Sequence, residues 1–347
     1  MNNGPETDDR IRVLVLKAGP RDGPIACGID YDTCDKGAQV SATGDDGDDD
    51  DGYRALSYMW GEGSSDDPYI TVGCGSEPCN DGISSTRVQI RKKLHQALKA
   101  IRDENNGQRL WVDALCINQK DTAEKSRQVG MMGKIFENAK SVIAWLGGEG
   151  DNSDTAMGLM ARPDKLETFL KENDDPSGAE ALWSIQEIFW AQSYVVRCGE
   201  KQEVPGDRFE ESLSVLHGTE WELGLRNTFA NVHRMRRKHA GGNNPLVWWL
   251  GSCRLGGFQA TDKRDFVYAL LGISQDCRDG RVTIVPNYSS KGVKDVFLEL
   301  FSRAAECPSL RHLNSGSMPA EVAAMMGLKI LRGFSVASGD NARFVEE

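Results

Sequence analysis

The chain alternates between short apolar runs and longer amphipathic stretches. The apolar runs are bounded by polar or turn residues, which is typical of buried β-strands, and they cover Ile11–Leu16, Arg54–Met59, Arg109–Ile117 and Ser141–Leu146. Glycine and proline turn signals follow the first run and predict that Ile25–Tyr31 pairs back with it as a hairpin. We therefore expect a hairpin followed by three further strands.

Two amphipathic stretches separate the last three runs. Apolar residues recur at helical spacing between Ile90 and Ile101, which predicts one helix. Asp121 and Glu124 have the spacing of a helix N-cap and its partner at the third helical position, and this helix is expected to continue to Ala139. Strands separated by helices favour right-handed crossovers, so the sequence predicts a parallel, doubly wound α/β sheet.

Ligands of such sheets bind outside the carboxyl ends of the strands. Those ends are predicted at Tyr58–Gly61, Asp113–Gln119 and Leu146–Gly148. Side chains in these segments are therefore the first candidates for a functional site.

The rest of the chain is expected to be mostly helical, with helical patterns in Ala181–Gln192, Arg208–His239 and Asp265–Ile273. The chain stops without a clear final element, which is compatible with a fragment of a longer protein. The expected organisation is a hairpin and acidic loop over residues 1–52 packing on an α/β domain over 53–200, followed by a mostly helical region over 201–347.

Composition narrows the classes of function. The chain has 52 acidic and 41 basic residues and a formal net charge of −11, which argues against nucleic-acid or anionic-membrane partners. No apolar run reaches the roughly 18 residues of a membrane span, and residues 1–10 lack the pattern of a secretory signal. The 9 scattered cysteines are typical of reduced thiols, so we expect a cytoplasmic protein. Cys74 and Cys79 lack a second pair at zinc spacing, so no metal is expected.

Ordered motifs in the chain resemble the fungal heterokaryon incompatibility (HET) domain. They are Tyr53–Gly61 (YRALSYMWG), Leu110–Gln119 (LWVDALCINQ), Ser141–Gly147 (SVIAWLG), and Trp183–Glu187 (WSIQE) with Cys198-Gly199 downstream. Ala260–Gly272 and Pro286–Ser289 are similar to the segment that follows HET domains in full-length proteins. The family usually has an aromatic and arginine-rich lead-in to its fourth motif, where this chain has Ala179–Leu182.

The resemblance implies a role in nonself recognition, in which contact between incompatible partners triggers programmed cell death. The resemblance implies that the partners are other incompatibility or NLR-like proteins, and it also implies self-assembly. HET domains are also distantly similar to TIR domains, which implies a flavodoxin/TIR-like parallel sheet flanked by helices. Some TIR domains hydrolyse NAD through a glutamate four residues after a tryptophan, and Trp183 and Glu187 have that spacing.

The chemistry of NAD cleavage fits such a pair. Residues at i and i+4 share a helix face, so Trp183 would cover a nicotinamide or adenine ring while Glu187 reaches the ribose. Cleavage of the N-glycosidic bond builds positive charge on the ribose, which a carboxylate stabilises. Nicotinamide is already a cationic leaving group and needs no general acid, so NAD is a substrate and no cofactor is expected. The expected pocket lining comprises Ser57, Tyr58, Trp60 and Gly61, with Asp113 as a second polar wall.

Structural explanations compete with each of these roles. Trp183 also fits a helix core, Glu187 fits a solvated or capping carboxylate, and Asp113 fits a hydrogen bond to a loop N–H group equally well. Cys116 is expected to be a small core residue, because no histidine in the matching motifs would activate it. The basic run Arg234–His239 is expected to be a solvated helix face.

Two functions from different classes therefore remain open. One is a TIR-like NAD glycohydrolase whose activity rises on assembly, and the other is a non-catalytic signalling module that recruits death effectors. A Glu187 side chain facing a cleft with Trp60 and Asp113 favours the enzyme. A Glu187 that is salt-bridged on an outer surface favours the module.

The Asp32–Gly52 segment generates a first prediction, because it is rich in Gly, Asp and Ser and has few apolar anchors. Removing about half of it should change the free energy of loop closure by only about 0.6 kcal/mol. The melting temperature of the shortened protein, measured by circular dichroism, should therefore stay close to that of the full chain. A fall of many degrees would show that the segment carries structure.

Overall fold

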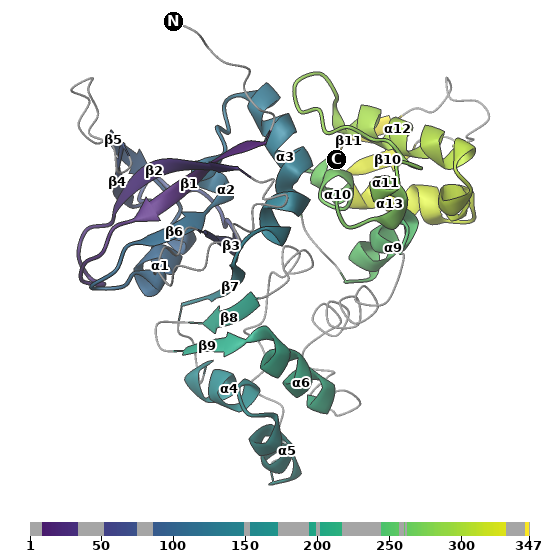
Figure 1. The fold of residues 1–347 in the computed structure, drawn as a ribbon. Helices are drawn as coiled ribbons and strands as arrows, with labels where there is room; N and C mark the ends of the chain where they lie inside the picture. The colour runs from purple at the N-terminus through teal and green to yellow at the C-terminus, as the bar shows by residue number, and fades with distance from the viewer. Residues whose placement is uncertain are drawn as a thin grey trace, which may run out of the picture. The chain divides into compact units, whose positions relative to one another are not determined.

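A computed structural model describes residues 9–33, 52–74, 86–148, 153–172, 194–198, 202–216, 244–256, 260, 262–330 and 344–346 (Figure 1). The chain divides into two compact units. The first comprises Met1–Ile117 and Lys134–Leu225, and the second comprises Asn118–Gly133 and Arg226–Glu347.

The first unit contains a nine-stranded mixed sheet with the order β5-β4-β2-β1-β6-β3-β7-β8-β9 (Figure 1). Its strands are β1 Arg10–Leu16, β2 Ala26–Thr33, β3 Arg54–Tyr58, β4 Tyr69–Cys74, β5 Thr86–Gln89, β6 Gln108–Trp111, β7 Ser141–Gly147, β8 Tyr194–Cys198 and β9 Gln202–Pro205.

Strand β3 lies between two parallel partners. It pairs with β6 through Arg54 and Leu110, and with β7 along its whole length, while β7 pairs in parallel with β8. By position along the chain, β6-β3-β7-β8 has the order 2-1-3-4, which is the start of a flavodoxin-like sheet. The predicted α/β class and the three adjacent parallel strands are confirmed.

The N-terminal hairpin is part of the same sheet. Residues Arg10–Leu16 pair antiparallel with Cys27–Thr33, as predicted, and β1 also pairs antiparallel with β6. Strands β4, β5, β8 and β9 were not predicted. The alternation of Ile70 and Val72 in β4 was a signal that could have been found, because β-branched residues at period two favour strands.

Helices cover both faces of the parallel strands. Tyr58, Trp145 and Arg197 are aligned on one face, and Arg197 donates a hydrogen bond to the carbonyl of Ala100 in α1 (Lys92–Ile101). Trp111 lies on the opposite face.

On that opposite face, the Trp111 ring packs edge-on against Phe136 of α3 (Thr122–Glu137), with ring centroids 5.5 Å apart. Tyr53 donates a hydrogen bond of 2.6 Å to the carbonyl of Ile135 in the same helix. Helices α4 (Ser153–Met160) and α6 (Gly206–Leu216) adjoin β8 and β9, and α5 (Pro163–Glu172) packs on both helices. The predicted 90–101 and 121–139 helices, and the start of the 208–239 helix, are confirmed.

The prediction of one continuous strand over Arg109–Ile117 was wrong. The strand ends at Trp111, and Asp113–Cys116 form the short helix α2. The carbonyl of Val112 accepts the N–H groups of Leu115 and Cys116, at 3.0 and 2.7 Å, which closes a helical turn. The run is mostly apolar, with Arg109 and Asp113–Leu115 partly exposed and the other residues buried. Apolar character alone cannot distinguish a strand from a short helix.

Arg102, directly after α1, closes the turn between β1 and β2. Its buried side chain donates hydrogen bonds to the carbonyls of Lys17, Ala18 and Pro24, at 3.0, 3.2 and 3.0 Å, and further bonds to Pro20 and Gly23. Gly19 has a φ of +149°, and a Cβ there would lie 2.3 Å from the guanidinium, so this turn requires glycine.

Arg102→Lys should therefore destabilise the first unit. A lysine ammonium group cannot reproduce the several hydrogen bonds of the planar guanidinium. The carbonyls left without a donor should lower the free energy of unfolding by about 2 kcal/mol or more. Urea unfolding followed by far-UV circular dichroism measures the loss. Arg21→Lys, an exposed position in the same turn, is the matched control and should change the midpoint little. Equal losses in both variants would contradict this role for Arg102.

The second unit is mostly helical, as predicted. Its described elements are α9 Leu246–Gly256, α10 Asp265–Tyr268, α11 Gln275–Arg278, α12 Val293–Glu306, the 3₁₀ helix η2 Pro308–Asn314, α13 Met318–Met325 and the antiparallel pair β10 Leu328–Ile330 and β11 Phe344–Glu346, together with the first part of α3. The predicted helix over Asp265–Ile273 is shorter than expected, because turns replace it after Tyr268. The buried Asp276 carboxylate joins three elements by accepting hydrogen bonds from Leu246 N–H and the Ser309 hydroxyl.

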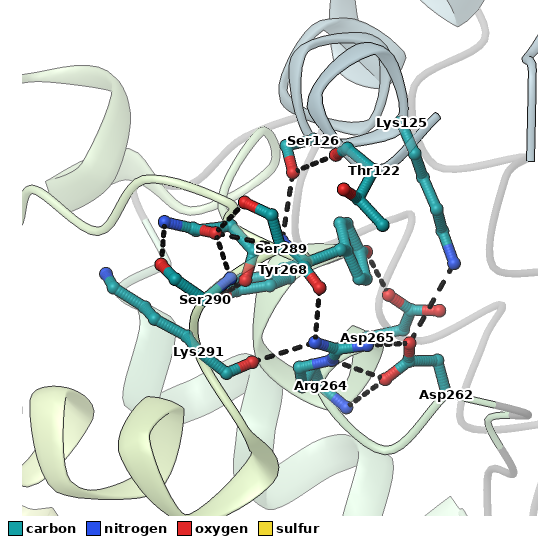
Figure 2. Close-up of polar contacts among 12 residues, drawn as sticks. Thr122, Lys125, Ser126, Asp262, Arg264, Asp265, Tyr268, Ser289, Ser290 and Lys291 are labelled. Atoms are coloured by element: carbon teal, nitrogen blue, oxygen red, sulfur yellow. Dashed lines mark hydrogen bonds and ion pairs between the residues drawn. The ribbon is translucent and has the colours of Figure 1, made fainter. Parts of the chain in front are cut away.

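A polar cluster joins α3 to the segment around α10 (Figure 2). Arg264 forms a bidentate pair with Asp262, with N–O distances of 2.9 and 2.7 Å, and donates to the carbonyls of Tyr288 and Lys291. Lys125 of α3 lies 3.8 Å from Asp262 and 4.3 Å from the centre of the Tyr288 ring. The guanidinium is therefore engaged on several sides within the protein.

The Tyr288 side chain connects this cluster to a partly buried carboxyl group. Its hydroxyl donates a hydrogen bond to Asp265, and its backbone N–H donates to the Ser126 hydroxyl at 2.9 Å. Desolvation raises the pKa of Asp265 to about 6, against the opposing effects of the Tyr288 hydrogen bond and the charges of Lys125 and Arg264. The negative charge of Asp262 acts in the same direction as desolvation.

Stability of the second unit should consequently fall as the pH rises from 5 to 7.5. The pKa of Asp265 is raised from 3.8 to about 6 on folding, so its protonation stabilises the folded state fully at low pH. This stabilisation is lost as the pH rises through about 6, and the free energy of unfolding falls by at most about 3 kcal/mol. Limited proteolysis across a urea series, with the cleavage products identified by mass spectrometry, measures unfolding of residues 262–306 separately from that of the first unit. Asp265→Asn, which cannot titrate, should flatten the pH dependence, and an unchanged slope in that variant would assign it to other groups.

Candidate functional site

The residues predicted to line a pocket lie at the carboxyl end of β3. Ser57 and Tyr58 are the last residues of this strand, and only 1% and 6% of their surfaces are exposed. Trp60 and Gly61 follow in the loop and are partly exposed. The first two therefore belong to the packed sheet, and the last two lie at its surface.

Trp60 and Asp113 are in direct contact. The Trp60 indole Nε1 donates a hydrogen bond of 2.8 Å to Asp113 Oδ2, and Asp113 Oδ1 accepts the N–H of Ala114 at 2.7 Å. Trp60 follows β3 and Asp113 opens α2 just after β6, so adjacent strands bring the two side chains together. The bond to Ala114 is the structural role that was weighed for Asp113, and the bond to Trp60 fixes the indole at the candidate site.

The topology of the sheet singles out the boundary between β3 and β7. The connection after β3 leads to β6 on one side, and the connection after β7 leads to β8 on the other side. Ligands of such sheets bind at this switch point. The loops that follow both strands are rich in glycine, with Gly61 and Gly63 after β3, and Gly147 and Gly148 at the end of β7. A Cβ built on either Gly147 or Gly148 would meet nothing within 4 Å.

Two basic residues lie against the loop after β3, and the sequence pattern had not singled them out. Arg91 Nη1 donates to the carbonyl of Gly61 at 3.0 Å. A Cβ on Gly61 would lie 3.2 Å from the Lys93 side chain, and a Cβ on Gly63 would lie 2.9 Å from Arg91 Nη1. The sequence held no local signal for this contact, because the Gly61–Gly63 loop and the start of α1 are far apart in the chain.

The loop itself is attached to the start of α1. Asp67 is buried and accepts the N–H groups of Ser64 and Lys92, at 3.0 and 3.3 Å. The Gln89 amide donates to the carbonyls of Ser65 and Asp67. These bonds hold the loop backbone close to the first turn of the helix.

Cys116 is buried in the core, as expected. Burial raises the pKa of its thiol to about 12, so the thiolate needed for nucleophilic chemistry is scarce at neutral pH. Among the described residues, no three His, Cys, Asp or Glu side chains are placed to hold a metal ion. No helix in the described part of the chain is long and apolar enough to cross a bilayer.

Trp183 and Glu187 lie outside the described residues, as do the predicted helix over Ala181–Gln192 and the basic run Arg234–His239. Residues 34–51, the bulk of the acidic segment, also lie outside them, whereas Asp32 and Thr33 belong to β2.

Comparison with known proteins identifies the region around this site. Residues 53–203 match the family described as "Heterokaryon incompatibility protein (HET)". A stretch of 141 residues, 39% of the chain, is 32% identical to "Heterokaryon incompatibility protein 6, OR allele" of Neurospora crassa.

The chain spans about a fifth of the length of that relative, since the match covers 20% of it. No solved structure matches the chain. The matched residues contain β3, β6, β7 and both members of the Trp60–Asp113 pair, in agreement with the resemblance read from the motifs. Residues 53–203 of this chain are therefore the part that matches the HET family.

Proposed function

We propose that this protein acts in heterokaryon incompatibility, and that its HET domain triggers cell death by hydrolysing NAD at the nicotinamide N-glycosidic bond. The family match of residues 53–203, together with the name of the Neurospora relative, supports the incompatibility role. The observation that carries the enzymatic part is the Trp60–Asp113 pair beside a flavodoxin-like switch point, where sheets of this order bind ligands.

In the proposed reaction, the bond between the ribose and nicotinamide breaks and water adds to the ribose. Glu187 stabilises the positive charge that develops on the ribose. Trp183, four residues earlier, covers a flat ring of the substrate. Trp60 offers a second aromatic surface, whose orientation is held by the 2.8 Å bond to Asp113.

A non-catalytic signalling module is the second candidate function. Two observations favour it: both oxygens of Asp113 already accept hydrogen bonds, and Ser57 and Tyr58 are buried within the sheet. In this case the domain would recruit death effectors, other incompatibility or NLR-like proteins, or further copies of itself. Catalysis by the purified protein distinguishes the two functions.

Glu187→Gln keeps the size of the side chain and removes its charge. Because the ribosyl cation exists only near the transition state, turnover of NAD should fall roughly a hundredfold, on the order of 3 kcal/mol, with a smaller change in KM. Trp183→Ala should chiefly raise KM, since stacking acts on the ground and transition states alike. Nicotinamide release by concentrated protein is the measurement, and Glu104→Gln, an exposed carboxylate in the first unit, is the control.

Expression in a fungal host tests whether hydrolysis leads to death. Glu187→Gln should abolish cell death at an expression level matched to the unmodified protein, whereas Glu104→Gln should retain it. Undiminished death with a stably folded Glu187→Gln protein would reject the enzymatic function and favour the signalling module.

A further inference from the structure

The loop after β3 presents exposed backbone at the switch point. Glu62, Gly63 and Ser64 are exposed, and Gly61 adopts a φ of +72°, a conformation that glycine adopts without strain. Because neither glycine carries a side chain, ligand atoms can approach the backbone of this loop closely.

The same glycines make room for two cations. The Arg91 and Lys93 side chains occupy positions that a Cβ on Gly63 or Gly61 would crowd, at 2.9 and 3.2 Å. Asp67, the buried acid of this loop, is engaged by two backbone N–H groups, and Glu62 is exposed. In the described ranges, no carboxylate lies within ion-pair distance of Arg91 or Lys93.

The cations adjoin the aromatic part of the candidate site. Gly61 follows Trp60 directly, so the carbonyl that receives the Arg91 bond is one residue from the indole held by Asp113. A flat partly exposed ring beside two cations and a glycine loop is an arrangement suited to a ligand with a ring and phosphate groups. Arginine binds phosphate through several N–H groups, and lysine binds it as a point charge.

We propose that Arg91, Lys93 and the Gly61–Gly63 backbone form a subsite for the pyrophosphate of a dinucleotide. The identification of this dinucleotide as NAD rests on the function proposed above. The subsite holds phosphates that do not react, so it contributes equally to binding of the substrate and of the transition state, and its loss appears in Kd and KM with little change in kcat.

Isothermal titration of the full chain with ADP-ribose, which retains the pyrophosphate but lacks nicotinamide, tests the subsite directly. Lys93→Ala should raise Kd about tenfold. Lys92→Ala is the matched control, because it removes the same charge from the neighbouring exposed position, about 100° around the helix, and it should change Kd less than twofold. Gly63→Ala should also weaken binding by displacing Arg91, whose Nη1 lies 2.9 Å from the new Cβ.

The outcomes separate this proposal from the proposed reaction. Loss of ADP-ribose binding in Lys93→Ala but not in Lys92→Ala supports the subsite, even in a protein that releases no nicotinamide. Equal effects of the two lysine variants, or no binding of ADP-ribose to the unmodified protein, would overturn it. If Glu187→Gln stops nicotinamide release while Lys93→Ala leaves Kd and KM unchanged, the subsite is refuted and the reaction stands.

Discussion

Parallel pairing on both sides of β3 is the constraint that organises the first unit. A strand with parallel neighbours on each side cannot be joined to either by a tight turn, so long connections must leave and return over the faces of the sheet. Helix α1 and the end of α3, with Ile135 and Phe136, lie within these connections and pack on opposite faces. The same constraint brings the loops after β3, β6 and β7 to one edge, which is why Trp60 and Asp113, far apart in sequence, can share a hydrogen bond of 2.8 Å.

The sequence was most informative where periodicity and local caps agree. The helix that begins after Asp121 is an example, since the Asp121 carboxylate accepts the N–H groups of Ala123 and Glu124 as an N-cap does. The Glu124 side chain, however, accepts the N–H of Asn118 in place of completing the expected capping box. The local pattern located the helix start, and the preceding loop determined the second bond.

Long-range pairing was less accessible from the sequence. Strand β6 and helix α2 form one apolar run, and hydrophobicity alone could not locate the change from strand to helix that places Asp113 beside Trp60. Arg91 and Lys93 were missed because a pair of basic residues at a helix start is ordinary until the glycine loop packed against it is known. The sequence could therefore place candidate site residues at the ends of strands. It could not identify which other segment of the chain each of them contacts.

The position of the N-terminal hairpin affects how the family-matched region can be isolated. Strands β1 and β2 precede the family-matched residues 53–203, yet they lie inside the sheet, between β4 and β6. A fragment cut to the matched boundaries would lack β1 and β2, which join the β5-β4 pair to the other five strands of the sheet. One edge of β4 and one edge of β6 would then have no hydrogen-bond partners. Exposed edges of this kind pair with other chains and promote aggregation. A fragment that begins near residue 9 keeps the sheet continuous. The folding unit of this protein therefore begins before the first residue of the family match.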